Sequence, residues 1–124
     1  MSQRGIEFGK YCEARAVRFL KKNGYRILER NYRCAFGEID AIAEESGYVV
    51  FIEIKSQASL LFGPPYLRIT NKKKKNITNS ALSYLKKYGL SEKDCRIDVV
   101  SVCLLNGDYE MELIKNAFEM SDGG

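Results

Sequence analysis

The segment VVFIEIK at residues 49–55 constrains the fold of this chain more than any other feature. Its first four residues are all apolar, whereas a strand with one face in water alternates apolar and polar side chains. The segment is therefore expected to form a strand in the interior of a sheet. Because successive side chains of a strand point to opposite faces, Glu53 and Lys55 are expected to point to the same face.

A second acidic residue lies in the segment GEIDAI at residues 37–42, which is expected to form a neighbouring strand. If Asp40 and Glu53 face each other about 4 Å apart, their charges repel by roughly 4 kcal/mol at an effective dielectric constant near 20. A divalent cation between them would remove this repulsion. Mg²⁺ prefers oxygen ligands and is usually held by one or two carboxylates, so Asp40 and Glu53 are predicted to bind Mg²⁺ or Mn²⁺.

An acid on one strand and an acid-x-base triplet on the next are the layout of a metal-dependent nuclease, with Asp40, Glu53 and Lys55 as catalytic residues. Lys55 would orient a water molecule or stabilise the charge that develops on a phosphate. In the structural alternative, Asp40 is an acid at a strand end, and Glu53 and Lys55 form an ion pair on an edge strand. The apolar run before Glu53 argues against an edge strand.

Length and composition limit the remaining possibilities. The chain has 124 residues, 45% hydrophobic and 29% charged, which predicts one globular domain over residues 1–124 with a flexible tail at 119–124. No run approaches the roughly 20 apolar residues of a membrane span, so a cytoplasmic protein without a membrane partner is predicted. The net charge of +4 is too small to indicate nucleic-acid binding by itself.

The absence of histidine excludes several classes of enzyme. Without histidine there is no Ser-His-Asp triad, no His-paired cysteine nucleophile and no histidine base. The four cysteines contain no CxxC pair and a mixed Cys/His zinc site is excluded, so reduced thiols are expected. Carboxylate and lysine chemistry remains.

Hydrophobic periodicity and turn residues predict an α/β fold with a mixed sheet. Gly24 is expected to end the first helix, Thr70 to cap the second, and Asn106-Gly107 to form a hairpin turn. Residues 59–67 are expected to form a long irregular loop, whose part at 62–65 (Phe-Gly-Pro-Pro) acts as a wedge or guide or is a rigid surface loop. The helices are predicted at residues 8–22 and 71–88, and the strands at 25–31, 38–43, 48–57, 95–105 and 109–114.

Glu13 lies on the apolar face of the first helix, so its carboxylate is directed towards the sheet and needs a partner. One interpretation is a third acidic group that binds the metal directly or through water. The alternative is a structural acid held by backbone amides or by an arginine such as Arg33 or Arg96. Asp98, between apolar neighbours on a core strand, is predicted to be structural.

Four consecutive lysines begin the second helix. Cations there oppose the helix dipole at a cost of about a few tenths of a kcal/mol each, whereas a bound phosphate would make them favourable. We predict that Lys72, Lys73, Lys74 and Lys75, together with Arg33, bind a nucleic-acid backbone without reading its sequence. The alternative is a solvated helix end that aids solubility.

The order of these motifs resembles one family. The segments are GKYCEARAVRFL, NGYRILERNYR, GEIDAIA, VVFIEIK, FGPP, a lysine-rich helix and RIDVVSV. Across residues 9–118 they resemble the YraN-like bacterial proteins, an uncharacterised family placed among the PD-(D/E)XK, or restriction-endonuclease-like, nucleases. The resemblance implies a mixed central sheet flanked by helices, with Asp40, Glu53 and Lys55 at the motif positions and Glu13 at a family glutamate.

The chain departs from the family pattern in two places. Ser56-Gln57 follows the motif lysine where relatives usually carry Thr-Arg, and Lys74 replaces a glutamine. The change at Gln57 affects one phosphate or site contact and leaves the metal residues in place.

We therefore predict a restriction-endonuclease-like α/β domain and a metal-dependent endonuclease that hydrolyses phosphodiester bonds in nucleic acid, with DNA favoured over RNA. A nucleic-acid-binding module that keeps the fold without cleavage is the second hypothesis, and a structural or interaction protein without metal is the third. A homodimer that cleaves branched junctions follows only from the resemblance to archaeal resolvases of the same superfamily.

Overall fold

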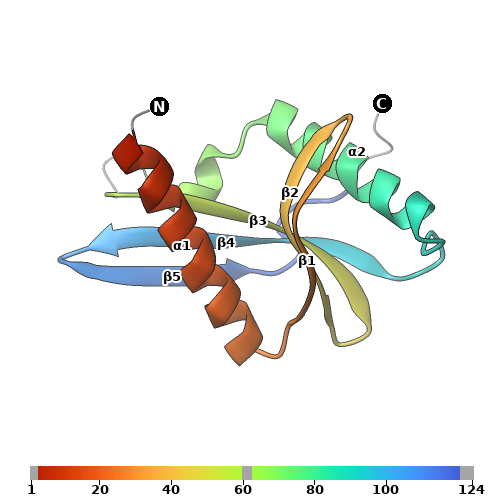
Figure 1. The fold of residues 1–124 in the computed structure, drawn as a ribbon, viewed down its shortest axis with the longest axis horizontal. Coiled ribbons are helices and arrows are strands. Elements are labelled where there is room, and N and C mark those ends of the chain that lie inside the picture. The colour runs from red at the N-terminus through yellow and green to blue at the C-terminus, as the bar shows by residue number, and fades with distance from the viewer. Residues whose placement is uncertain (1–2, 60–62, 121–124) are drawn as a thin grey trace.

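The computed structural model describes residues 3–59 and 63–120 (Figure 1). These residues form two α-helices, one short 3-10 helix and five strands, as the predicted α/β class requires. In chain order the elements are α1 (Gln3–Lys22), β1 (Arg26–Cys34), β2 (Gly37–Glu45), β3 (Tyr48–Gln57), η1 (Pro65–Arg68), α2 (Asn71–Lys87), β4 (Cys95–Leu105) and β5 (Asp108–Ile114).

The five strands form one mixed sheet in the order β1-β2-β3-β4-β5. β3 and β4 run parallel, with η1 and α2 in the connection between them, and the other neighbours are antiparallel. β3 is the central strand, and its apolar residues 49–52 are buried as predicted. The alternative that placed Glu53 and Lys55 on an edge strand is therefore wrong.

One helix covers each face of the sheet (Figure 1). The core on the α1 face includes Ala16, Leu20 and Val50, and the core on the α2 face includes Phe51 and Ile77. Successive residues of β3 point to opposite faces, so Val50 lies in the core on the α1 face and Phe51 in the core on the α2 face. The odd-numbered residues of this strand therefore point towards α2. The fold is the restriction-endonuclease-like arrangement predicted from the sequence, a mixed central sheet flanked by helices.

β2 and β3 separate at one end of the sheet. Their pairing ends at Ala41 and Ile52, whereas β2 continues to pair with β1, and β3 with β4, beyond this point. The sheet therefore forks, and Asp40 and Glu53 are the first residues past the fork.

The predicted caps and turns are confirmed. Gly24 has φ of 88° at the end of α1, and Asn106 and Gly107 have φ of 51° and 82° in the hairpin between β4 and β5. The hydroxyl of Thr70 accepts a hydrogen bond of 3.1 Å from the backbone N–H of Lys73 and so caps α2.

The ends of several elements differ from the prediction. α1 begins at Gln3 rather than Phe8, because its exposed first turns have no apolar pattern to reveal them. β1 continues to Cys34 rather than Asn31, because its pairing with β2 extends to the hairpin turn.

Parts of two predicted segments lie outside the described residues. Residues 60–62, with the predicted wedge Phe62, and residues 121–124 of the predicted tail are among them. Within the described part of that tail, Met120 packs against the core on the α2 face. None of the described helices is long and apolar enough to span a membrane. The cysteines are free thiols, as expected.

Candidate functional site

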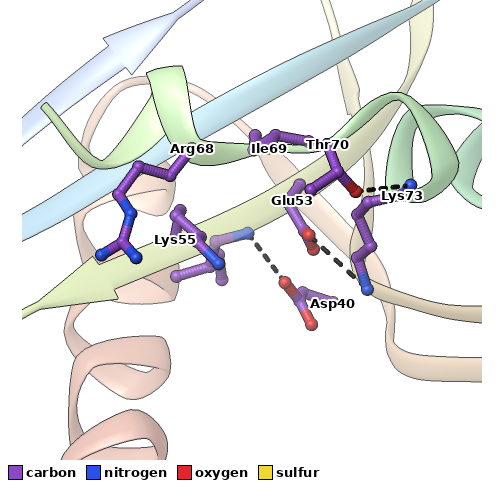
Figure 2. Close-up of a pocket in the computed structure, with 8 residues that line it drawn as sticks. Asp40, Glu53, Lys55, Arg68, Ile69, Thr70 and Lys73 are labelled. Carbon is purple, nitrogen blue, oxygen red and sulfur yellow. Dashed lines mark hydrogen bonds and ion pairs between the residues drawn. The ribbon is translucent and has the colours of Figure 1, made fainter.

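Asp40 and Glu53 lie opposite each other just past the fork (Figure 2). The antiparallel register pairs Ala41 with Ile52, and one further step along it places Asp40 beside Glu53 on the same face of the sheet. Asp40 is half-buried, and Glu53 is only 6% exposed. The structure thus brings together the two carboxylates that the sequence suggested as facing partners.

The backbone of β3 holds the Asp40 carboxylate in place, and the neighbouring Glu53 changes its pKa. The N–H of Ile54 donates a hydrogen bond of 2.7 Å to Asp40 Oδ2. Burial, and next the Glu53 carboxylate, raise the pKa of Asp40 to about 8, although Ile54 N–H and Lys73 act in the opposite direction. The two acids therefore tend to retain a proton, which a bound cation could displace.

Lys73 brings a positive charge to this pair. It extends from the first turn of α2, and its Nζ lies 3.6 Å from Glu53 Oε2 (Figure 2). The sequence assigned Lys73 to a surface for nucleic acid and gave no sign of this contact. The contact depends on where the connection between β3 and β4 places the start of α2, which local sequence patterns do not specify.

Lys55, Arg68 and Thr70 complete a pocket of about 390 Å³ around the acids. Lys55 lines it from β3 together with Glu53, as the predicted alternation requires (Figure 2). Arg68 and Thr70 come from the segment just before α2. Three cationic side chains beside two carboxylates suit a phosphate group that lies next to a metal site.

Arg68 is a site residue that the sequence analysis missed. Its guanidinium donates a hydrogen bond of 3.1 Å to Gln57 Oε1, and the Gln57 amide donates to the carbonyl of Gly63. Gln57 thus ties the segment before α2 to the end of β3. Arg68 lines the pocket, whereas Gln57 holds it from outside.

Glu13 approaches Asp40 from α1. Burial, and next the charge of Asp40, raise the pKa of Glu13, while Arg30 opposes the rise. The arginine that acts on Glu13 among the described residues is Arg30, where the sequence suggested Arg33 or Arg96 as examples. Across residues 3–59 and 63–120, no group of three or more Asp, Glu, His or Cys side chains could hold a metal ion.

The four lysines at the start of α2 do not form one uniform surface. Lys72 and Lys75 are exposed. Lys73 faces the acidic pair, and Lys74 Nζ lies 5.5 Å from the centre of the Phe118 ring. Of the four lysines, Lys72 and Lys75 are therefore the two that are open to solvent.

Arg33, which was predicted to bind nucleic acid together with the four lysines, is highly exposed. Its Nε lies 3.7 Å from Glu38 Oε2.

Asp98 has the structural environment that was predicted. It accepts hydrogen bonds from Tyr25 Oη at 2.6 Å, Arg96 Nε at 2.9 Å and the backbone N–H of Asn116 at 2.9 Å. These contacts hold β4 in place and keep Asp98 out of the pocket.

The residues present fit a hard divalent cation. Both acidic groups offer oxygen, and Mg²⁺ commonly takes one or two carboxylates and keeps several water molecules. The raised pKa of Asp40 indicates that the described surroundings do not fully compensate two negative charges. Asp40 and Glu53 are thus suitable ligands for Mg²⁺ or Mn²⁺.

The fold and the pocket define a small α/β protein with a forked mixed sheet and an acidic pair at the fork. The chain belongs to the uncharacterised protein family UPF0102, whose profile matches residues 12–102. This membership confirms the resemblance to the uncharacterised YraN-like family itself.

Relatives of this family match nearly the whole chain. A UPF0102 protein of Syntrophus aciditrophicus is 43% identical over 95% of this chain and 93% of its own length. One of Clostridium botulinum strain Hall is 43% identical over 92% of this chain and 95% of its own length. One of Geobacter metallireducens is 38% identical over 98% of this chain and 99% of its own length. The names of these relatives state no activity.

Proposed function

We propose that this protein is a metal-dependent nuclease that hydrolyses phosphodiester bonds. The observation that carries the proposal is the pair Asp40 and Glu53 at the fork, in one pocket with Lys55. Two facing carboxylates are unfavourable for the fold, as the raised pKa of Asp40 indicates. Perturbed acids that lie in a pocket with cationic side chains are typical of catalytic sites.

Each side chain in the pocket has a role in this proposal. Asp40 and Glu53 would hold Mg²⁺ or Mn²⁺, which when bound supplies positive charge at the phosphate and makes a water molecule more acidic. Lys55 would orient the attacking water. Lys73 and Arg68 would bind the non-bridging phosphate oxygens and stabilise their charge in the transition state.

Hydrolysis forms a bond from the water oxygen to phosphorus and breaks the bond to one ester oxygen, which leaves with a proton. Glu13 lies next to Asp40, and its raised pKa suits a group that accepts and returns a proton through water. We assign Glu13 to this indirect role because the described residues contain no cluster of three acids that could hold a metal.

The proposal is tested by a cleavage assay on duplex, single-stranded and branched DNA and on RNA. Each substrate is incubated with Mg²⁺, with Mn²⁺ or with EDTA, and Asp40→Asn is assayed beside the wild type because it keeps the side-chain size and removes the charge. Cleavage that needs the metal and Asp40 is the expected result. No cleavage of any substrate with either metal would contradict the proposal.

A nucleic-acid-binding module without cleavage is the second candidate, and one observation favours it. Lys73 already brings a positive charge to within 3.6 Å of Glu53, so part of the repulsion is relieved without a metal. A module of this kind would bind nucleic acid equally well in Mg²⁺ and in EDTA, and Asp40→Asn would leave its affinity unchanged.

A further inference from the structure

A large cleft lies on the other side of Asp40 from the pocket that holds Glu53, Lys55 and Lys73. It has a volume of about 1230 Å³ and lies between the first half of α1 and the strands at the fork. Figure 1 shows this half of α1 near the end of β3. Asp40 and Ile54 line both the cleft and the pocket. A chain that places a phosphate at Asp40 can therefore extend into the cleft.

Gly9 keeps this cleft open above Glu13. It lies inside α1, where glycine is less stable than alanine. A Cβ added at Gly9 would meet no atom within 4 Å, and its φ is not positive, so neither packing nor backbone conformation calls for glycine. Glu13, one turn further along the helix, lines the same cleft. A longer side chain at position 9 would fill the approach to Glu13 and Asp40.

The walls of the cleft combine apolar and cationic side chains. Ile6 and Phe8 are the apolar part, and Ile6 is 37% exposed. Lys10 on α1 and Arg30 on β1 are cationic. Unpaired bases present apolar faces for such contacts while their backbone presents phosphates, and a single strand offers both at once.

A duplex suits this cleft less well. Its outer surface is a dense row of phosphates, which favours a surface with an excess of positive charge. The cleft instead carries Glu13, Glu38 and Asp40, and Arg33 on its rim pairs with Glu38 at 3.7 Å. These acids offset the basic residues of the wall.

From these observations, and resting on the proposed nuclease function, we propose that the substrate carries a single-stranded segment that binds in the cleft between α1 and the fork. A duplex part of the same substrate would contact Lys72 and Lys75 outside the pocket. Cleavage is then expected close to the junction between the paired and unpaired parts.

The test compares a labelled single-stranded oligonucleotide with a labelled blunt hairpin whose paired stem contains the same sequence. Binding of each is measured by fluorescence anisotropy in EDTA. Gly9→Leu fills the cleft without changing any charge and should weaken binding of the single strand by roughly tenfold, the decrease expected for one stacked base, while duplex binding stays unchanged. Gly9→Ala is the matched control and should bind both as the wild type does. The melting temperature of each variant shows whether it is folded.

A second pair of variants tests the same cleft if Gly9→Leu does not fold. Lys10→Ala should weaken single-strand binding, whereas Lys21→Ala, exposed on the same helix and away from the cleft, should not. If Gly9→Leu is folded and binds the single strand as well as the wild type does, the inference is overturned. If Gly9→Leu is unfolded, unchanged single-strand binding by Lys10→Ala overturns it instead. A wild type that binds the duplex more tightly than the single strand would also overturn it. Because binding is measured without metal, failure to cleave would contradict the nuclease proposal and leave this result intact.

Discussion

Lys73 is the residue at which the acidic pair and the basic run meet. Its ammonium lies 3.6 Å from Glu53 Oε2, where it competes with a divalent cation for the same carboxylate. Lys73→Met keeps a long side chain and removes the charge. We expect Mg²⁺ to bind up to about fivefold more tightly, because a half-exposed ion pair contributes at most about 1 kcal/mol. Isothermal titration calorimetry measures this change.

Cleavage by Lys73→Met should nevertheless fall, since the phosphate then has one cationic partner fewer. The matched control is Lys72→Met, at the exposed neighbouring position, which should leave both Mg²⁺ affinity and the rate at saturating substrate unchanged. Weaker Mg²⁺ binding by Lys73→Met would contradict the competition between ammonium and metal.

Lys55 should act on the chemical step rather than on binding. Lys55→Ala is expected to lower the cleavage rate by about 10²- to 10³-fold, the usual cost of removing one preorganised group that acts in the transition state, while affinity stays within about threefold. Single-turnover rates and anisotropy titrations measure the two quantities separately. Lys93→Ala, at an exposed position outside the pocket, is the control. An equal decrease in affinity and rate would make Lys55 a binding residue.

At the scale of elements, the start of α2 contributes to two surfaces. Lys73 points into the pocket, and Lys72 and Lys75 are exposed beside it. A combined Lys72→Ala and Lys75→Ala change should weaken binding to all nucleic-acid sequences alike. The slope of log affinity against log salt should become shallower by about 0.7 to 0.9 for each phosphate that the variant no longer neutralises.

The other end of the same helix provides the control for this prediction. Lys86 and Lys87 are exposed in the last turn of α2, so changing both to alanine removes the same charge from a different place. An equal effect of the two double changes would indicate general attraction by net charge, and the start of α2 would not be a specific surface.

The elements show which parts of the site a sequence can predict. The apolar run before Glu53 identified a central strand, and alternation placed Lys55 in the pocket with Glu53, because both depend on neighbours in sequence. The positions of Arg68 and Lys73 were missed, because they depend on how η1 and α2 return across the sheet. The early start of α1 was missed because its first turns are polar and exposed.

At the scale of the whole molecule, the stability of the metal-free protein should depend on the protonation of Asp40. Its pKa is raised to about 8 in the folded protein, above the value of about 3.9 for Asp in an unfolded chain. The folded state therefore binds this proton more tightly. The stabilisation is complete below about pH 4 and disappears as the pH rises towards 8. Asp40→Asn should remove this part of the pH dependence in urea unfolding with EDTA.

Mg²⁺ should have the opposite pH dependence, because it binds the deprotonated carboxylates and displaces the proton. Its stabilising effect should therefore increase towards pH 8, and a concentration of about 100 times Kd should stabilise the protein by about 2.7 kcal/mol. The rise in melting temperature should be larger at about pH 8 than at about pH 6 and absent in Asp40→Asn. Asp108→Asn, at an exposed acid at the start of β5, should behave as the wild type does. Equal shifts in Asp40→Asn and the wild type would mean that Mg²⁺ binds elsewhere, and the fork would then not be the metal site.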